Sequence, residues 1–107
     1  MLIFISSPYA GDIEKNTKAA RSYCRYAVER GHNPIAPHLL YPQFLDENSS
    51  EERDLGLKMG LEILDKCDEM WCFGDPSPGM TVEISHAEKR SIPIRYFTAD
   101  AGKEKTI

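Results

Sequence analysis

The sequence predicts an α/β fold of the flavodoxin/Rossmann-like type, a three-layer sandwich around a parallel sheet with the strand order 2-1-3-4. Three observations lead to this fold class. Short, continuously apolar segments alternate with longer amphipathic ones, which is typical of strands covered by helices on both faces. Turn-forming residues cluster after the apolar segments. Two prolines, Pro34 and Pro37, place the second strand at an edge of the sheet, where the order 2-1-3-4 puts it.

The first half of the chain predicts two strands with a long helix between them. Asp12 is the expected N-cap of this helix and Gly31 its end. Ala20, Tyr23 and Ala27 lie at helical spacing and form its inward face. The elements expected here are a strand over residues 2–5, a loop over 6–11, a helix over 12–30 and a strand over 33–37.

The second half predicts two further helices and two further strands. Ser50 is the expected cap of the first of these helices, and Leu57, Leu61 and Leu64 are its inward stripe. Trp71 lies inside an apolar strand and is expected in the core. The elements expected here are an apolar segment over residues 38–45, a helix over 51–66, a strand over 70–73, a loop over 74–79, a helix over 80–89 and a strand over 92–97.

Length and composition indicate one small domain, expected over residues 1–97, with a loose C-terminal tail over 98–107. The net charge of -4 argues against a nucleic-acid backbone as the main partner. No apolar stretch approaches the ~20 residues that cross a bilayer, and Met1–Ile5 is too short for a signal peptide. Cys24, Cys67 and Cys72 lack metal-ligand spacing, so we expect reduced thiols in a cytoplasmic protein.

Two loops are the expected ligand site. In a sheet of order 2-1-3-4 the topological switch point lies between the first and third strands, and ligands bind beyond their carboxyl ends. Ser6–Gly11 and Gly74–Gly79 follow these two strands. The start of the next helix, at Ser77, Gly79 and Met80, is a candidate anion site; a proline-rich turn with a serine cap is the alternative.

Side chains near these loops extend the candidate site. Ser6, Ser7 and Tyr9 offer hydroxyl donors and an aromatic wall for a sugar or base. His38 follows the second strand, where it either contacts a ligand or has a structural role.

Three charged residues complete the list of candidates. Glu83 follows Gly79 by one helical turn, where a carboxylate stabilises or captures an oxocarbenium-like sugar; a solvent-facing glutamate is the alternative. Asp75 is a candidate general acid toward a departing base, and Arg53 lies in the first turn of a helix.

These segments together resemble the nucleoside 2-deoxyribosyltransferase-like superfamily, and more closely its small uncharacterised phage and bacterial members. A more distant similarity is to deoxynucleoside 5′-monophosphate N-glycosidases. The resemblance covers most of residues 2–97. It is carried by residues 3–11, by Pro37 and His38, by residues 67–71 and by residues 77–83.

The resemblance implies an N-glycosidic-bond enzyme, a 2-deoxyribosyltransferase or a nucleotide N-hydrolase, that acts on a nucleoside or nucleoside monophosphate without metal or cofactor. It implies that Glu83 is the nucleophile. It further implies that Ser77 and Gly79 hold phosphate or sugar hydroxyls, and that Ser6, Ser7 and Tyr9 contact the substrate.

The chain departs from the pattern of the superfamily at two positions. A tyrosine of the first strand falls at Phe4, and an aspartate that assists the leaving base falls near Gly60. Arg53 and Asp75 are the residues that would compensate. The departures keep an alternative open, a non-catalytic protein that binds a nucleotide or a ribosylated signal; a structural subunit with a vestigial cleft is a third hypothesis.

The size of the chain also predicts self-association. A domain this small buries limited surface, and the apolar segment His38–Leu45 is available to pack against a second copy. We therefore expect a homodimer or a larger even homo-oligomer.

Overall fold

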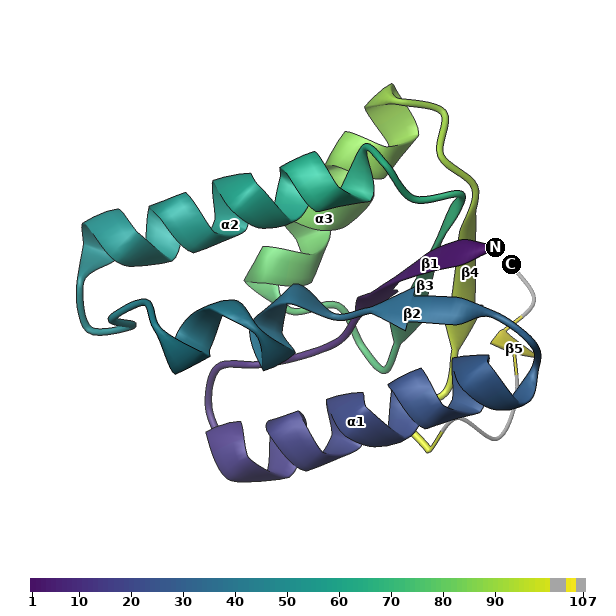
Figure 1. The fold of residues 1–107 in the computed structure, drawn as a ribbon, viewed down its shortest axis with the longest axis horizontal. Helices are drawn as coiled ribbons and strands as arrows, with labels where there is room; N and C mark the ends of the chain where they lie inside the picture. Colours follow the sequence, from purple (N-terminus) through teal and green to yellow (C-terminus); the bar gives the residue numbers. More distant parts are fainter. Residues whose placement is uncertain (101–103, 106–107) are drawn as a thin grey trace.

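The fold is a five-stranded sheet with helices on both faces (Figure 1). It is known from a computed structural model, which describes residues 1–100 and 104–105. The strands are β1 (Leu2–Ser6), β2 (Asn33–Ile35), β3 (Glu69–Phe73), β4 (Ile94–Phe97) and β5 (Glu104–Lys105). The helices are α1 (Ile13–Glu29), α2 (Ser50–Leu64) and α3 (Pro78–Lys89), with two short 3-10 helices at Pro37–Leu39 and Tyr41–Gln43.

The strand order is β2-β1-β3-β4-β5. The pairs β1–β2, β1–β3 and β3–β4 are parallel, which confirms the predicted fold class and the order 2-1-3-4. The fifth strand was not expected. It lies within the segment 98–107 and pairs antiparallel with β4, so the prediction of a loose tail does not hold for Glu104–Lys105. Residues 101–103 and 106–107 of that segment lie outside the described residues.

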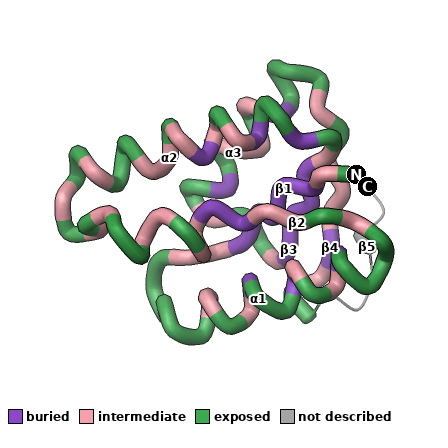
Figure 2. The backbone as a smooth tube through the Cα atoms, in the orientation of Figure 1, coloured by how far each residue is buried: buried purple, intermediate pink, exposed green. Residues whose placement is uncertain are grey.

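Two apolar layers hold the helices on the sheet. Ile3, Ile5 and Trp71 pack toward α1, whereas Phe4 and Met70 pack toward α2 and α3. This alternation is the period of two expected of a strand. Because both faces are covered, β1 and β3 are apolar almost throughout, and Figure 2 shows them as largely buried. The predicted inward face of α1 is confirmed, since Ala20, Tyr23 and Ala27 are buried.

The helix starts follow the side chains available for capping. Asp12 caps α1, as predicted, by accepting a hydrogen bond from the Lys15 N–H. The cap of α2 is Ser49 rather than Ser50, because the Ser49 side chain accepts from the Glu52 N–H three residues on.

The third helix and the second strand also differ from their predicted bounds. α3 begins at Pro78, two residues earlier than predicted, because proline suits the first turn of a helix and Ser77 caps it. β2 ends at Ile35 and not at Pro37, which instead begins a 3-10 helix. In the described part of the chain, no helix has the length and apolar character needed to span a membrane.

We predict that Trp71→Ala lowers the free energy of unfolding by about 3–5 kcal/mol, because the side chain is 1% exposed and its loss leaves a cavity between the sheet and α1. Val28→Ala is the matched control. Val28 is 49% exposed on α1, so its loss changes the free energy by less than about 0.5 kcal/mol. Urea unfolding followed by far-UV circular dichroism measures both, and equal losses would contradict this account of the core.

Candidate functional site

A cavity of about 540 Å³ lies at the carboxyl ends of β1 and β3, and its volume is in the range usual for small-molecule sites. We call it the switch-point cavity. The loop after β1, the segment between β2 and α2, one face of α2 and the first turns of α3 form its walls. The candidate residues that line it are Ser7, Tyr9, His38, Arg53, Ser77, Gly79, Met80 and Glu83.

Two candidate residues do not line this cavity. Ser6 is 1% exposed and lies at the end of β1. Asp75 is exposed in the loop between β3 and α3 and is not part of the cavity wall. The chain turns directly before it at Gly74, whose φ is 80°. The role of Asp75 as a general acid toward a departing base stays a prediction.

Glu83 is the carboxylate that α3 presents to the cavity. Its Oε1 accepts a hydrogen bond of 2.7 Å from the Ser6 hydroxyl. No described residue is a hydrogen-bond partner of Oε2, and no buried side-chain oxygen among the described residues lacks a partner, so Oε2 is accessible. Burial raises the pKa of Glu83 from 4.5 to about 7, although the Ser6 hydrogen bond acts in the opposite direction.

The start of α3 is a weaker anion site than the sequence predicts. The Met80 N–H donates to the Ser77 hydroxyl oxygen at 3.3 Å, and the Ser77 N–H lies 3.4 Å from the Met80 sulfur. Pro78 has no N–H. The Gly79 N–H therefore remains for a ligand, together with the Ser77 hydroxyl proton. A Cβ built on Gly79 would meet nothing within 4 Å, so the backbone is open to close approach there.

The rings of Tyr9 and His38 and the carboxylate of Glu47 form another wall of the cavity. The Tyr9 and His38 rings lie 5.6 Å apart between centroids, and His38 Nε2 is 3.3 Å from the Ser7 hydroxyl. Burial lowers the pKa of His38 to about 4, so the imidazole is neutral at pH 7. Burial and a hydrogen bond with Glu47 raise the pKa of Tyr9 to about 12.

Three further acidic residues line the cavity, and sequence reasoning missed them. Asp46, Glu47 and Glu52 line it, with Arg53 as the cation among its lining residues. Their clustering was the available signal, since Asp46 and Glu47 directly follow the apolar segment and Glu52 lies in the first turn of the second helix.

One face of α2 forms the floor of the cavity, and sequence reasoning connected Gly60 with the site but not Gly56 or Leu57. Gly56, Leu57 and Gly60 line it at helical spacing. At Gly60, where the resemblance places an aspartate, a Cβ would lie 3.7 Å from Pro37 Cβ, an ordinary contact. Gly60 therefore lines the cavity where α2 packs closely against Pro37.

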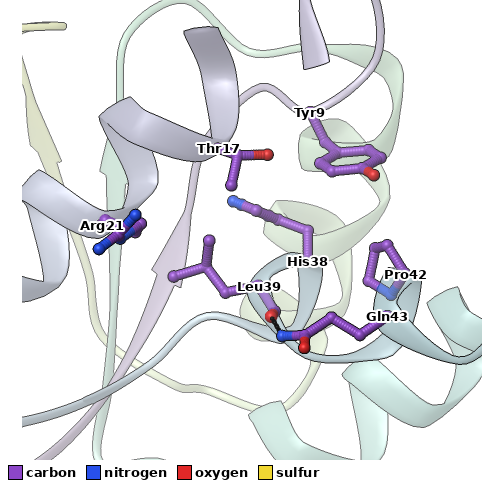
Figure 3. A pocket seen from close by; sticks show the side chains of 7 residues that line it. All are labelled: Tyr9, Thr17, Arg21, His38, Leu39, Pro42 and Gln43. Carbon is purple, nitrogen blue, oxygen red and sulfur yellow. Dashed lines mark hydrogen bonds between the residues drawn. The ribbon is translucent and has the colours of Figure 1, made fainter. Parts of the chain in front are cut away.

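A second hollow, also of about 540 Å³, lies beside α1 (Figure 3). Tyr9, His38 and Pro42 line both hollows and so form a wall between them. Thr17 and Arg21 from α1 complete the second hollow, together with Leu39 and Gln43.

The described residues hold no group of three or more His, Cys, Asp or Glu side chains arranged to bind a metal ion. The three cysteines are unpaired, and Cys67 and Cys72 are buried.

These observations define an α/β protein with a parallel sheet and a cavity at its topological switch point. The chain belongs to the family described as "Domain of unknown function (DUF7768)", whose sequence model matches residues 1–97. No curated protein sequence matches the chain.

The fold is similar to that of a 2-deoxyribosyltransferase from the psychrotolerant bacterium Bacillus psychrosaccharolyticus, which is described as a biocatalyst for nucleoside synthesis. The TM-score is 0.70, the identity is 19%, and the match covers 99% of this chain and 77% of that chain. A likeness at this level of identity establishes the fold.

We predict that Glu83 makes stability depend on pH. The folded protein holds a proton up to about pH 7, which the unfolded chain releases near 4.5. The free energy of unfolding therefore falls as pH rises through this window, by up to about 3 kcal/mol above it. Glu83→Gln carries no such charge. Its free energy of unfolding is expected to equal that of the wild type near pH 4.5 and to exceed it at pH 8.

Urea unfolding at the two pH values measures this difference. Glu88→Gln, an exposed change on the same helix, is the control and is expected to leave the pH dependence as it is. If Glu83→Gln had the same effect at both pH values, Glu83 would not be the group that retains the proton.

Proposed function

We propose that this protein cleaves or transfers the N-glycosidic bond of a nucleoside, with Glu83 as its nucleophile. The observation that carries the proposal is the position and hydrogen bonding of the Glu83 carboxylate. One oxygen accepts from Ser6, the other is accessible, and the side chain lines a cavity of ligand size. The fold likeness to a 2-deoxyribosyltransferase supports the same class of chemistry.

The reaction has two steps. The Glu83 carboxylate bonds to the anomeric carbon as the bond from that carbon to the base nitrogen breaks, and the base leaves with the electron pair and takes up a proton. Water or a second base then attacks the same carbon and releases the carboxylate. Because the nucleophile must be ionised, and the pKa of Glu83 is about 7, the rate rises through neutral pH.

The proposed ligand pose follows from the donors and rings around Glu83. The Gly79 N–H and the Ser77 hydroxyl lie at the start of the same helix and are placed to hold sugar hydroxyls. The Tyr9 and His38 rings provide flat apolar surfaces for the base. The neutral imidazole of His38 suits an uncharged base, because the ring then places no positive charge against the base.

The charge of the cavity favours a nucleoside over its monophosphate. Asp46, Glu47 and Glu52 face the same space as Glu83, against the guanidinium of Arg53. A phosphate dianion would be repelled by these carboxylates. It would also find at the start of α3 the Gly79 N–H as the one open backbone donor, with the Ser77 hydroxyl beside it, in place of the several free N–H groups that phosphate sites use.

A binding protein without turnover is the second candidate function. Two observations favour it. Asp75 lies outside the cavity wall, and Gly60 brings no carboxylate to the place where the resemblance expects one for the leaving base. Such a protein would hold a nucleoside, a nucleotide or a ribosylated signal with the same contacts and release it unchanged.

We predict that incubation with a panel of 2-deoxynucleosides and their 5′-monophosphates releases free base, faster from the nucleosides. Glu83→Gln is expected to lower the rate at least about 1000-fold, because an amide is a poor nucleophile at the anomeric carbon. Chromatography of the base measures the rate, and Glu88→Gln is the matched control on the exposed side of α3.

The outcomes separate the two functions. Base release that persists in Glu83→Gln would remove Glu83 as nucleophile. Tight binding in calorimetry without any product would instead establish the binding protein. Faster cleavage of the monophosphates would contradict the argument from cavity charge.

We also propose that the chain forms a homodimer or a larger even homo-oligomer. Leu40 is 42% exposed, Phe44 62% and Leu55 44%. Burial of such side chains between copies contributes roughly 25 cal/mol per Å² of apolar surface. Light scattering at micromolar concentration is expected to give at least twice the 12.1 kDa mass of the chain, and a monomeric mass would contradict this proposal.

A further inference from the structure

Ser6 is a buried hydroxyl that the cavity does not reach. It is 1% exposed and is not among the lining residues, although the sequence predicts a substrate contact there. Its hydroxyl lies 2.7 Å from Glu83 Oε1. We propose that Ser6 is a positioning residue, whose hydroxyl fixes one carboxylate oxygen of Glu83 and thereby leaves the other facing the ligand. The catalytic consequence rests on the proposed function; the positioning itself does not.

The donor is held by the sheet. Ser6 is the last residue of β1 and is in register with Cys72 of the neighbouring strand β3. It follows Phe4 by two residues, so both side chains are on the face that α2 and α3 cover. A hydroxyl on a central strand has little freedom, and it therefore defines the position of the flexible glutamate side chain that reaches it.

The direction of the hydrogen bond follows from the neighbouring sulfur. A serine hydroxyl has one proton to give, and both Glu83 and Cys72 lie within its reach. Burial raises the pKa of Cys72 to about 12, so its sulfur keeps its own proton at neutral pH. A thiol does not compete for the proton of a hydroxyl as an anion does, and the Ser6 proton is therefore donated to the carboxylate.

Among the described residues, Ser6 is the hydrogen-bond partner of Glu83. The Ser77 hydroxyl and the Gly79 N–H lie at the start of the same helix and make no hydrogen bond to this carboxylate. Glu47 bonds to Tyr9, Glu52 accepts from the Asp46 N–H, and Arg53 is exposed on α2. Apolar Phe4 and Met80 surround the rest of the site on this face of the sheet. Without the Ser6 hydroxyl, Oε1 would lose its hydrogen bond in a place where water is scarce.

Loss of the hydroxyl has two measurable consequences. Because the hydrogen bond favours the ionised carboxylate, its removal raises the pKa of Glu83 above the wild-type value. The untethered side chain also samples other rotamers, so fewer molecules hold the oxygen in line for attack. A substrate contact would act differently, since its loss weakens binding and leaves the titration of Glu83 unchanged.

The first test needs no turnover. The Glu83 carboxyl is titrated by carbon-detected NMR in the full chain, as wild type, Ser6→Ala and Ser85→Ala. Ser6→Ala removes one oxygen and is expected to raise the pKa by about one unit, the effect of one charge-assisted hydrogen bond. Ser85→Ala, an exposed serine on the same helix, is expected to leave it unchanged. An unchanged pKa in Ser6→Ala would overturn the inference.

The second test uses the reaction. Ser6→Ala is expected to lower kcat at least about tenfold with KM little changed, and to move the midpoint of the pH–rate profile upward together with the NMR titration. Ser6→Thr keeps the hydroxyl and is expected to restore the wild-type titration; thermal unfolding of both variants monitors folding. A rise in KM alone would make Ser6 a substrate contact. If the wild type releases no base, the proposed function fails, and the titration still decides the role of Ser6.

Discussion

The parallel pairing of β1 with β3, under helices on both faces, is the constraint on which the site depends. Because the two strands run in the same direction, their carboxyl ends meet at one edge of the sheet. α1 follows β1 and α3 follows β3 on opposite faces of the sheet (Figure 1). The chain therefore separates at these strand ends, where the switch-point cavity lies. The switch-point cavity is therefore a product of topology, and its chemistry is decided by the few side chains that end the strands and begin the helices.

The sequence predicts those parts of the structure that depend on local pattern. The buried strands and the inward face of α1 follow from apolar spacing, and Asp12 follows from its capping chemistry. What it misses depends on the tertiary structure. Ser49 and Ser50 are equally good caps, and only the path of the chain into α2 selects the first. Glu104–Lys105 has no strand pattern, since its pairing depends on the free edge of β4.

The sequence predicts only some of the residues of the site, because the others reach it through the tertiary structure. Ser7 directly follows β1, and Glu83 lies near the start of the helix that follows β3; both reach the cavity because topology places the ends of these strands together. Asp75 does not, because the backbone turn at Gly74 precedes it and no residue pattern reports the direction of that turn. Glu47 and Glu52 were missed because they reach the cavity from a segment far from the switch point in sequence. The hydroxyl of Ser6 was predicted at the site, but its burial, and hence its partner, depends on how α3 lies on the sheet.

The sizes of two opposing effects, the helix dipole and desolvation, explain why the pKa of Glu83, one turn beyond the start of α3, is raised and not lowered. The dipole of α3 favours its ionised form by about 0.3–1 kcal/mol, and this effect fades beyond the first turn. The change of its pKa from 4.5 to about 7 corresponds to about 3 kcal/mol in the opposite direction. Desolvation therefore exceeds the dipole, and the charge of Glu83 is balanced near neutral pH. A ligand that develops positive charge beside it, as a sugar losing its base does, stabilises the ionised form at the step where that form is needed.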